Sequence, residues 1–170
     1  ITSTLQQAAA NRLGLSPQRT MQVAQRLYEG VDLGGGERVG LITYMRTDSV
    51  AVAQQALAEA EGYIREHFGP EYTDGPRRYR TKSKSAQEAH EAIRPTSITR
   101  SPESIASSLD PQQLKLYRLI WNRAVASQMA DARLDKTAVE LGCRCRGREL
   151  LWRASGSIVT FPGYLRVYGD

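Results

Sequence analysis

Tyr44 and Arg46 stand two residues apart in the run GLITYMRTDS, which covers residues 40–49. The apolar stretch 39–45 predicts a short strand, and residues two apart in a strand share a face. We expect a helix to begin at Asp48 or Ser49, which would place the positive end of its dipole beside the phenol and the guanidinium. These three groups together suit an anion such as a phosphodiester.

The phenol of Tyr44 has two interpretations. Most tyrosines in strands simply pack against their neighbours. A phenol ionises near pH ~10, so a nucleophilic tyrosine needs neighbours that favour the phenolate or remove its proton in the transition state. The polar residues that follow Tyr44 favour this second interpretation.

A second polar run, QEAHEAIRP, covers residues 87–95. If residues 86–93 form two helical turns, His90 and Arg94 lie four apart on one face, and Gln87 lies three residues before His90 on the same side. A helical histidine is more often a structural hydrogen-bonding group than a catalyst. No HExxH run or His/Cys ligand spacing occurs, so zinc is not implied.

Taken together, these runs resemble the signatures of type IA DNA topoisomerases. The run at 40–49 is similar to the active-site tyrosine motif of that family, and AQEAHEAIRP at 86–95 is similar to its second signature. The stretches TSTLQQAA at 2–9 and AQRLYE at 24–29 also match. Met45, between the tyrosine and the arginine, resembles the bacterial topoisomerase I branch. Val50 departs from the pattern, since the family more usually has threonine there.

The resemblance implies a role for each site residue. Tyr44 would attack a phosphodiester of single-stranded DNA to give a 5′-phosphotyrosine and a free 3′-OH. Arg46 would hold the phosphate, and His90, oriented by Asp48, would bond to the phosphate or sugar. Further DNA contacts would come from Thr47, Asp48, Ser49, Gln87, Glu88 and Arg94. Strand passage and religation would relax negative supercoils without ATP.

The family also implies parts that this chain lacks. Its members carry a toprim domain in which a glutamate and a DxDxE cluster bind Mg²⁺, and no DxDxE occurs in these 170 residues. We therefore expect no metal site in this chain and no relaxation by this chain alone. The expected partners are single-stranded DNA and the toprim and arch domains of the same enzyme. A start at Ile1 rather than methionine also suggests a piece of a longer chain.

The remaining patterns predict an α+β fold that is mainly α. Helices are expected from Ser3 to Leu13 and from Pro17 to Tyr28, as a helix-turn-helix of the winged type. The helix that starts at Asp48 or Ser49 should end near His67. Further starts are expected at Ser101-Pro102 and Asp110-Pro111, the second with an apolar stripe of Leu114, Tyr117, Ile120, Trp121, Ala124 and Met129. Two strands joined at Arg146-Gly147 should follow.

The change of period near residue 131 predicts two domains. Residues 1–130 would form the tyrosine-bearing helical domain, which is domain III-like, and residues 131–170 a β segment of the arch domain, which is domain II-like. The alternating pattern around Cys143 and Cys145 indicates strands with one buried face, so we expect both cysteines to be buried and reduced.

Composition adds less than the motifs do. The chain is 41% hydrophobic and 24% charged, with a net charge of +5, and 19 of its 23 basic residues are arginine. A basic stretch at 77–84 is either a solvated loop or one that grips a nucleic acid backbone. Neither a signal peptide nor a membrane span is evident, so a soluble, non-secreted chain is expected. The resemblance implies a cytoplasmic, nucleoid-associated bacterial protein.

Two other hypotheses stay open at this stage. A non-catalytic winged-helix module would use residues 16–28 to read duplex DNA. A purely structural role for the tyrosine requires Tyr44 to be buried.

Overall fold

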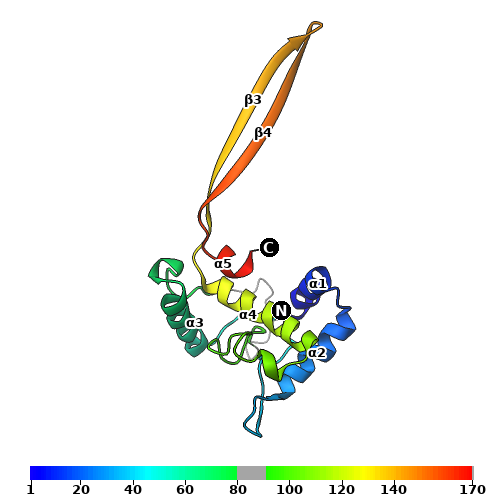
Figure 1. Ribbon diagram of the computed structural model, residues 1–170, viewed down its shortest axis with the longest axis vertical. Helices are drawn as coiled ribbons and strands as arrows, with labels where there is room; N and C mark the ends of the chain where they lie inside the picture. The colour runs from blue at the N-terminus through cyan, green and yellow to red at the C-terminus, as the bar shows by residue number, and fades with distance from the viewer. Residues whose placement is uncertain (80–90, 170) are drawn as a thin grey trace.

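A helical body carries a long, projecting β-hairpin in the computed structural model, which describes residues 1–79 and 91–169 (Figure 1). In chain order the elements are α1 (Thr2–Leu13), α2 (Pro17–Glu29), β1 (Val31–Asp32), β2 (Arg38–Val39), α3 (Gln54–His67), η1 (Pro70–Tyr72), η2 (Ala106–Ser108), α4 (Pro111–Gln128), β3 (Arg133–Cys145), β4 (Arg148–Phe161) and α5 (Leu165–Tyr168). This mainly α arrangement with a β-hairpin confirms the predicted fold class. No helix in the described ranges is long and apolar enough to cross a membrane.

Helix α4 forms the centre of the body and contacts α1, α2, α3 and α5. It begins as predicted, because the Asp110 carboxylate accepts hydrogen bonds from the first-turn N–H groups and Pro111 occupies the first helical position. Tyr117, Ile120 and Trp121 of the predicted stripe are buried. Burial of this apolar side provides the main stabilisation of the body.

The first two helices follow the predicted order. The Ser16 side chain caps α2, and Gly14 ends α1 in the left-handed conformation (φ 66°). The antiparallel strands β1 and β2 come directly after α2. The predicted cap at Ser3 is wrong, since α1 already begins at Thr2.

Three predicted elements differ in the structure. The strand expected at 39–45 is reduced to β2, and beyond it only Ile42 makes an isolated antiparallel bridge, with Pro95. Helix α3 begins at Gln54 rather than at Asp48 or Ser49. The stretch after Ser101-Pro102 forms turns and the short η2 instead of an α-helix. The helix predicted at 86–93 falls mostly outside the described residues, and 91–93 are not helical.

The hairpin of β3 and β4 turns at Arg146 (φ 51°) and Gly147 (φ 77°), as predicted. One face is apolar, with Leu141 opposite Trp152 and Cys143 opposite Leu150. The other face carries two ion pairs, Arg144–Glu149 at 2.8 Å and Arg153–Glu140 at 3.8 Å.

Both faces of this hairpin are exposed, and Leu141, Trp152 and the two cysteines are among the exposed side chains. The prediction that Cys143 and Cys145 are buried is therefore wrong for this chain, because no second layer of described residues covers the apolar face. After β4 the chain returns to the body, where Tyr164 N donates to Ala130 O at 2.9 Å. The domain boundary near residue 131 stays a prediction.

Candidate active site

Tyr44 lies in a segment without regular secondary structure, bent at Thr43, Met45 and Arg46, in which exposed and buried residues alternate. Tyr44 is 42% exposed, whereas Met45, the next residue, is fully buried. Arg46 and Asp48 are exposed like Tyr44, while Thr47 and Ser49 are buried. The segment thus leaves both the phenol and the guanidinium exposed without belonging to a sheet. A structural role for Tyr44 required a buried ring, and that condition is not met.

The end of α2 supports the tyrosine segment from one side. Leu41 N donates a hydrogen bond to Leu27 O at 2.8 Å. Gly40 makes this approach possible, because a Cβ atom at this position would lie 2.8 Å from Tyr28 O. The ring of Tyr28 then meets that of Tyr44 edge to face, with centroids 5.4 Å apart.

The start of α1 supports the segment from another side. Thr2 N donates to Thr47 O at 2.9 Å, and Thr47 N donates back to Thr2 Oγ1 at 2.9 Å. Thr2 Oγ1 also lies 2.8 Å from Met45 O, within hydrogen-bond distance. These contacts fix the backbone on both sides of Arg46.

The hydroxyls of Thr47 and Ser49 are used inside the segment. Thr47 Oγ1 accepts from Ser49 N at 3.0 Å, and Ser49 Oγ accepts from Ala51 N at 3.1 Å. These bonds satisfy backbone N–H groups within a segment that is not helical. The predicted helix dipole beside Tyr44 and Arg46 is consequently absent, since α3 starts only at Gln54.

The end of the second polar run lies alongside the tyrosine segment. Thr43 N donates to Arg94 O at 2.9 Å, and Thr96 N donates to Leu41 O at 3.0 Å. These bonds flank the bridge between Ile42 and Pro95. The structure therefore brings together the two runs that the sequence singled out. Gln87, Glu88 and His90 lie outside the described residues.

Arg94 points its guanidinium into the protein. Its side chain is only 17% exposed and pairs with Glu91 at 2.8 Å, and Nη1 donates to Pro95 O at 2.9 Å. Its Nε is buried without a hydrogen-bond partner among the described residues. The other carboxylate oxygen of Glu91 accepts from Ala53 N at 2.7 Å, at the start of α3.

The described part of the basic stretch also makes internal contacts. Arg77 forms ion pairs with Asp131 at 2.8 Å and with Asp74 at 3.7 Å. The hydrogen bond to Asp131 raises the pKa of Arg77 above its usual value. Arg78 is hydrogen-bonded to Gln54. Arg80, Lys82 and Lys84 lie outside the described residues.

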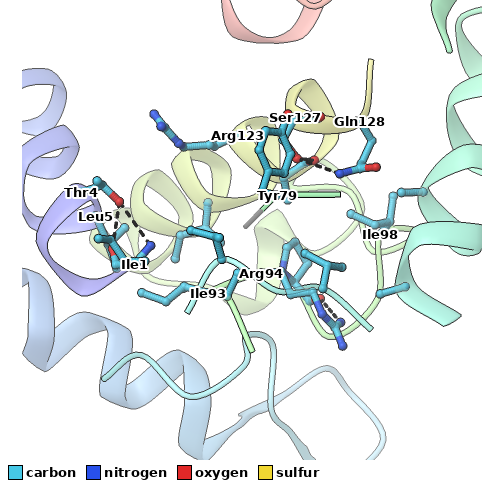
Figure 2. A pocket seen from close by; sticks show the side chains of 18 of the residues that line it. Ile1, Thr4, Leu5, Tyr79, Ile93, Arg94, Ile98, Arg123, Ser127 and Gln128 are labelled. Atoms are coloured by element: carbon cyan, nitrogen blue, oxygen red, sulfur yellow. Dashed lines mark hydrogen bonds between the residues drawn. The ribbon is translucent and has the colours of Figure 1, made fainter. Parts of the chain in front are cut away.

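A cavity of about 290 Å³ lies behind the site, between α1, α3, α4 and the segment 92–95 (Figure 2). Aliphatic side chains such as Leu5, Leu57 and Ile120 line most of it, and neither Tyr44 nor Arg46 is among the lining residues. The candidate site is therefore the exposed surface around Tyr44 rather than this cavity.

Comparison with known proteins assigns the family. The family model described as DNA topoisomerase matches residues 1–170. The chain belongs to the DNA topoisomerase family. Among the curated members of this family, DNA topoisomerase 1 of Xylella fastidiosa strain 9a5c is 51% identical over the whole chain, and that of Rickettsia felis is 48% identical. The chain spans 21% and 22% of their lengths.

A solved structure of the same DNA topoisomerase family has a similar fold. Full-length topoisomerase I of Thermotoga maritima matches 99% of this chain and 26% of its own chain, with a TM-score of 0.82 and 39% identity. The mainly α fold with its long hairpin is thus shared with a bacterial topoisomerase I.

Sequence reasoning missed three residues that hold the Tyr44 segment in place: Thr2, Tyr28 and Thr43. Thr2 and Tyr28 belong to the two stretches that match the family at 2–9 and 24–29. That match was the available signal, but a hydrogen bond across 45 residues cannot be read from spacing. Thr43 stands directly before the tyrosine, where its apolar neighbours indicated only a strand.

Proposed function

We propose that this chain is the tyrosine-bearing part of a type IA DNA topoisomerase, in which Tyr44 cleaves one DNA strand transiently. The observation that carries the proposal is the exposed phenol of Tyr44, with the exposed Arg46 two residues away, in a member of the DNA topoisomerase family. Because the chain spans about a fifth of its relatives, the activity is proposed for the complete enzyme.

The proposed step is a transesterification at phosphorus. The bond between Tyr44 Oη and phosphorus forms as the bond from phosphorus to the 3′ oxygen breaks. The phenol loses its proton, and the 3′ oxygen gains one to become a free hydroxyl. The product is a 5′-phosphotyrosine, and attack by the 3′-OH reverses the step. One phosphoester replaces another, so relaxation of negative supercoils by strand passage and religation needs no ATP.

Arg46 supplies charge at the site in this proposal. No described residue forms an ion pair with it, so its guanidinium is available to a phosphate that is brought to Tyr44. A charge-assisted contact of this kind stabilises the negative charge that develops as the phosphoryl group is attacked. We propose that Asp48, which is also exposed, orients His90 toward the phosphate or sugar.

The other predicted DNA contacts divide into two groups. We propose that Thr47, Ser49 and Arg94 shape the site from within, because their polar side-chain atoms bond to the protein itself. For Gln87 and Glu88 the proposal of DNA contact stands on the resemblance of the second run alone.

The described residues do not fit a magnesium site. No group of three His, Cys, Asp or Glu within residues 1–79 and 91–169 could hold a metal ion. We therefore derive no step through Mg²⁺ and propose that the toprim domain of the complete enzyme binds it. Because that domain lies outside this chain, we also propose that the isolated chain does not relax supercoiled DNA.

Covalent trapping on end-labelled DNA tests the proposal. The complete enzyme is mixed with a single-stranded oligonucleotide and denatured with detergent, and the protein is examined for label. A 3′-end label should stay with the protein, because the 5′ phosphate of the downstream fragment is attached to Tyr44. A 5′-end label should appear on a free fragment.

Two tyrosine variants complete the experiment. Tyr44→Phe should bind DNA and form no adduct, since only the attacking oxygen is removed. Tyr164→Phe changes another exposed tyrosine in the same way and should form the adduct normally. An adduct in Tyr44→Phe, or transfer of the 5′-end label to the protein, contradicts the proposal.

The order of α1, α2 and the β1–β2 hairpin favours a second candidate, a winged-helix module that binds duplex DNA without cleavage. That module would prefer duplex to single strands and would form no adduct in the complete enzyme.

A further inference from the structure

Thr43, the residue before Tyr44, bonds to the second polar run through both its hydroxyl and its backbone N–H. Its hydroxyl donates to Ala92 O at 2.7 Å and accepts from Arg94 N at 3.0 Å. Its backbone N–H donates to Arg94 O at 2.9 Å. Three hydrogen bonds thus join one residue to a segment about 50 positions further along the chain.

The segment that Thr43 holds is itself fixed. Ala92 N donates to Ala51 O at 2.8 Å. Glu91 accepts from Ala53 N and pairs with Arg94, so the segment is tied to the start of α3. Thr43 therefore connects the tyrosine segment to backbone that is itself hydrogen-bonded to the residues before α3.

The backbone around Tyr44 is held without a strand ladder. Residues 43–50 form none, and the only bridge nearby within the described part of the chain is that of Ile42 with Pro95. A strand within a sheet would hold Tyr44 by repeated backbone hydrogen bonds. Here threonine hydroxyls contribute, Thr43 on the residue before the tyrosine and Thr2 on the residues after it, which explains why Thr43 stands among apolar residues.

We propose that Thr43 is a positioning residue for Tyr44, which sets the direction of the phenol by locking the preceding peptide to Ala92 and Arg94. The inference rests on the proposed function of Tyr44. In-line attack at phosphorus depends on placement, and a displacement of about 1 Å can cost about 100-fold in rate. Loss of the hydroxyl should therefore slow cleavage by about 10- to 100-fold.

The same geometry serves attack and its reversal. Loss of positioning should slow religation by the same factor as cleavage, so the equilibrium amount of adduct should not change. DNA affinity should stay within about twofold, because Thr43 does not belong to the exposed side of the segment. A purely structural role predicts a different result: a smaller active fraction with unchanged rate constants.

The experiment uses single-turnover cleavage and religation by the complete enzyme on a labelled oligonucleotide. Thr43→Val keeps the shape but removes the hydroxyl, so it should lower both rate constants. Thr43→Ser restores a hydroxyl and should recover most of the rate. Thr137→Val makes the same change on the hairpin, away from the tyrosine segment, and should cleave normally. Active-site titration separates rate from active fraction.

Each outcome decides a different claim. If Thr43→Val has wild-type rate constants, with or without a smaller active fraction, the inference is overturned. The proposed function of Tyr44 still stands in that case, provided that Tyr44→Phe forms no adduct. An adduct in Tyr44→Phe overturns the proposed function and this inference with it. If Thr43→Val melts below the assay temperature, Thr43→Ala, which also lacks the hydroxyl, is measured in its place. The same loss in both rate constants is then expected.

Discussion

The ring of Tyr28 meets the ring of Tyr44 edge to face, with 5.4 Å between centroids and 64° between planes. Both rings are partly exposed, at 40% and 42%. The contact links the last turn of α2 to the proposed nucleophile and limits the directions that its ring can adopt. No sequence spacing indicated it, because the two rings come from a helix and from a separate segment 16 residues later.

Replacing Tyr28 with leucine should slow DNA cleavage while the fold persists. An edge-to-face pair contributes about 0.5–1.5 kcal/mol beyond its buried area, so its loss should cost roughly 2- to 10-fold in the rate of adduct formation. Tyr28→Phe keeps the ring contact and should cleave at nearly the normal rate. Single-turnover cleavage measures both variants. Equal rates in Tyr28→Leu and Tyr28→Phe would show that the ring contact has no part in cleavage.

Gly40→Ala should destabilise the chain, since its Cβ would lie 2.8 Å from Tyr28 O and force two segments apart. The expected loss is about 1–3 kcal/mol in the free energy of unfolding, measured in urea. Gly62 lies within α3, where a Cβ meets no atom within 4 Å. Gly62→Ala should therefore raise the stability by about 0.5–1 kcal/mol. Equal effects of the two substitutions would contradict the close approach at Gly40.

The sequence predicted those elements whose signals are local. Ser16 and Asp110 cap their helices as expected, and Arg146-Gly147 turns the hairpin, because each signal needs only its near neighbours. It failed at Asp48 and Ser49, the predicted helix start, since α3 begins only at Gln54. Ser49 Oγ accepts from the N–H two residues on, as a helix cap can, yet no helix follows it directly. The backbone just before it is bonded to Thr2, which is distant in sequence.

The hairpin shows a second kind of limit. Alternation along β3 and β4 correctly predicted one apolar face and one polar face. It also predicted burial of Cys143, but burial depends on a second layer that covers the apolar face. No described residue covers it, and Cys143 is exposed. Placement of Thr43 beside Arg94 was likewise beyond periodicity. The family resemblance linked the two runs, whereas the contact itself comes from hydrogen bonds of Thr43.

Alkaline pH should weaken the fold through Tyr117. Burial raises the pKa of Tyr117 well above its usual value. The unfolded chain releases this proton near pH ~10, while the folded chain retains it. The contribution of Tyr117 to the free energy of unfolding is complete below pH ~10. It falls as the pH rises further, by up to about 1.4 kcal/mol per pH unit.

Urea unfolding between pH 8 and 11 measures this loss. Tyr117→Phe should show a shallower decline, from a lower starting stability because the hydroxyl no longer donates to Arg100 O. Tyr164→Phe, an exposed change of the same type, should keep the normal decline. The same slope in all three proteins would exclude Tyr117 as the cause.

Binding of single-stranded DNA to the isolated chain should be weak and should depend strongly on salt. The net charge of +5 is carried mainly by arginines, several of them near the site. Each phosphate contact should lower the logarithm of the binding constant by roughly 0.7 per logarithmic unit of salt. Anisotropy titrations at two salt concentrations measure the slope. A binding constant independent of salt, or a preference for duplex at every length, would favour the winged-helix module.

Arg46→Ala should leave the nucleophile intact and withdraw the charged contact with the phosphate. Removing a contact that stabilises transition-state charge costs about 2–4 kcal/mol, which corresponds to a roughly 30- to 1000-fold slower cleavage. Partial activity should remain, unlike in Tyr44→Phe. Arg46→Lys keeps the charge without the planar, two-pronged donor. Its cleavage rate should lie between that of Arg46→Ala and the normal rate.

Rates of adduct formation in the complete enzyme measure this effect, with DNA affinity determined separately. Arg148→Ala, at the tip of the hairpin, removes an exposed arginine of the same kind and should cleave normally. If Arg46→Ala weakens only DNA affinity and not the rate at saturating DNA, Arg46 binds the ground state alone. The stabilisation of the phosphoryl charge would then have to come from another group, and a His90 variant would be the next one to measure.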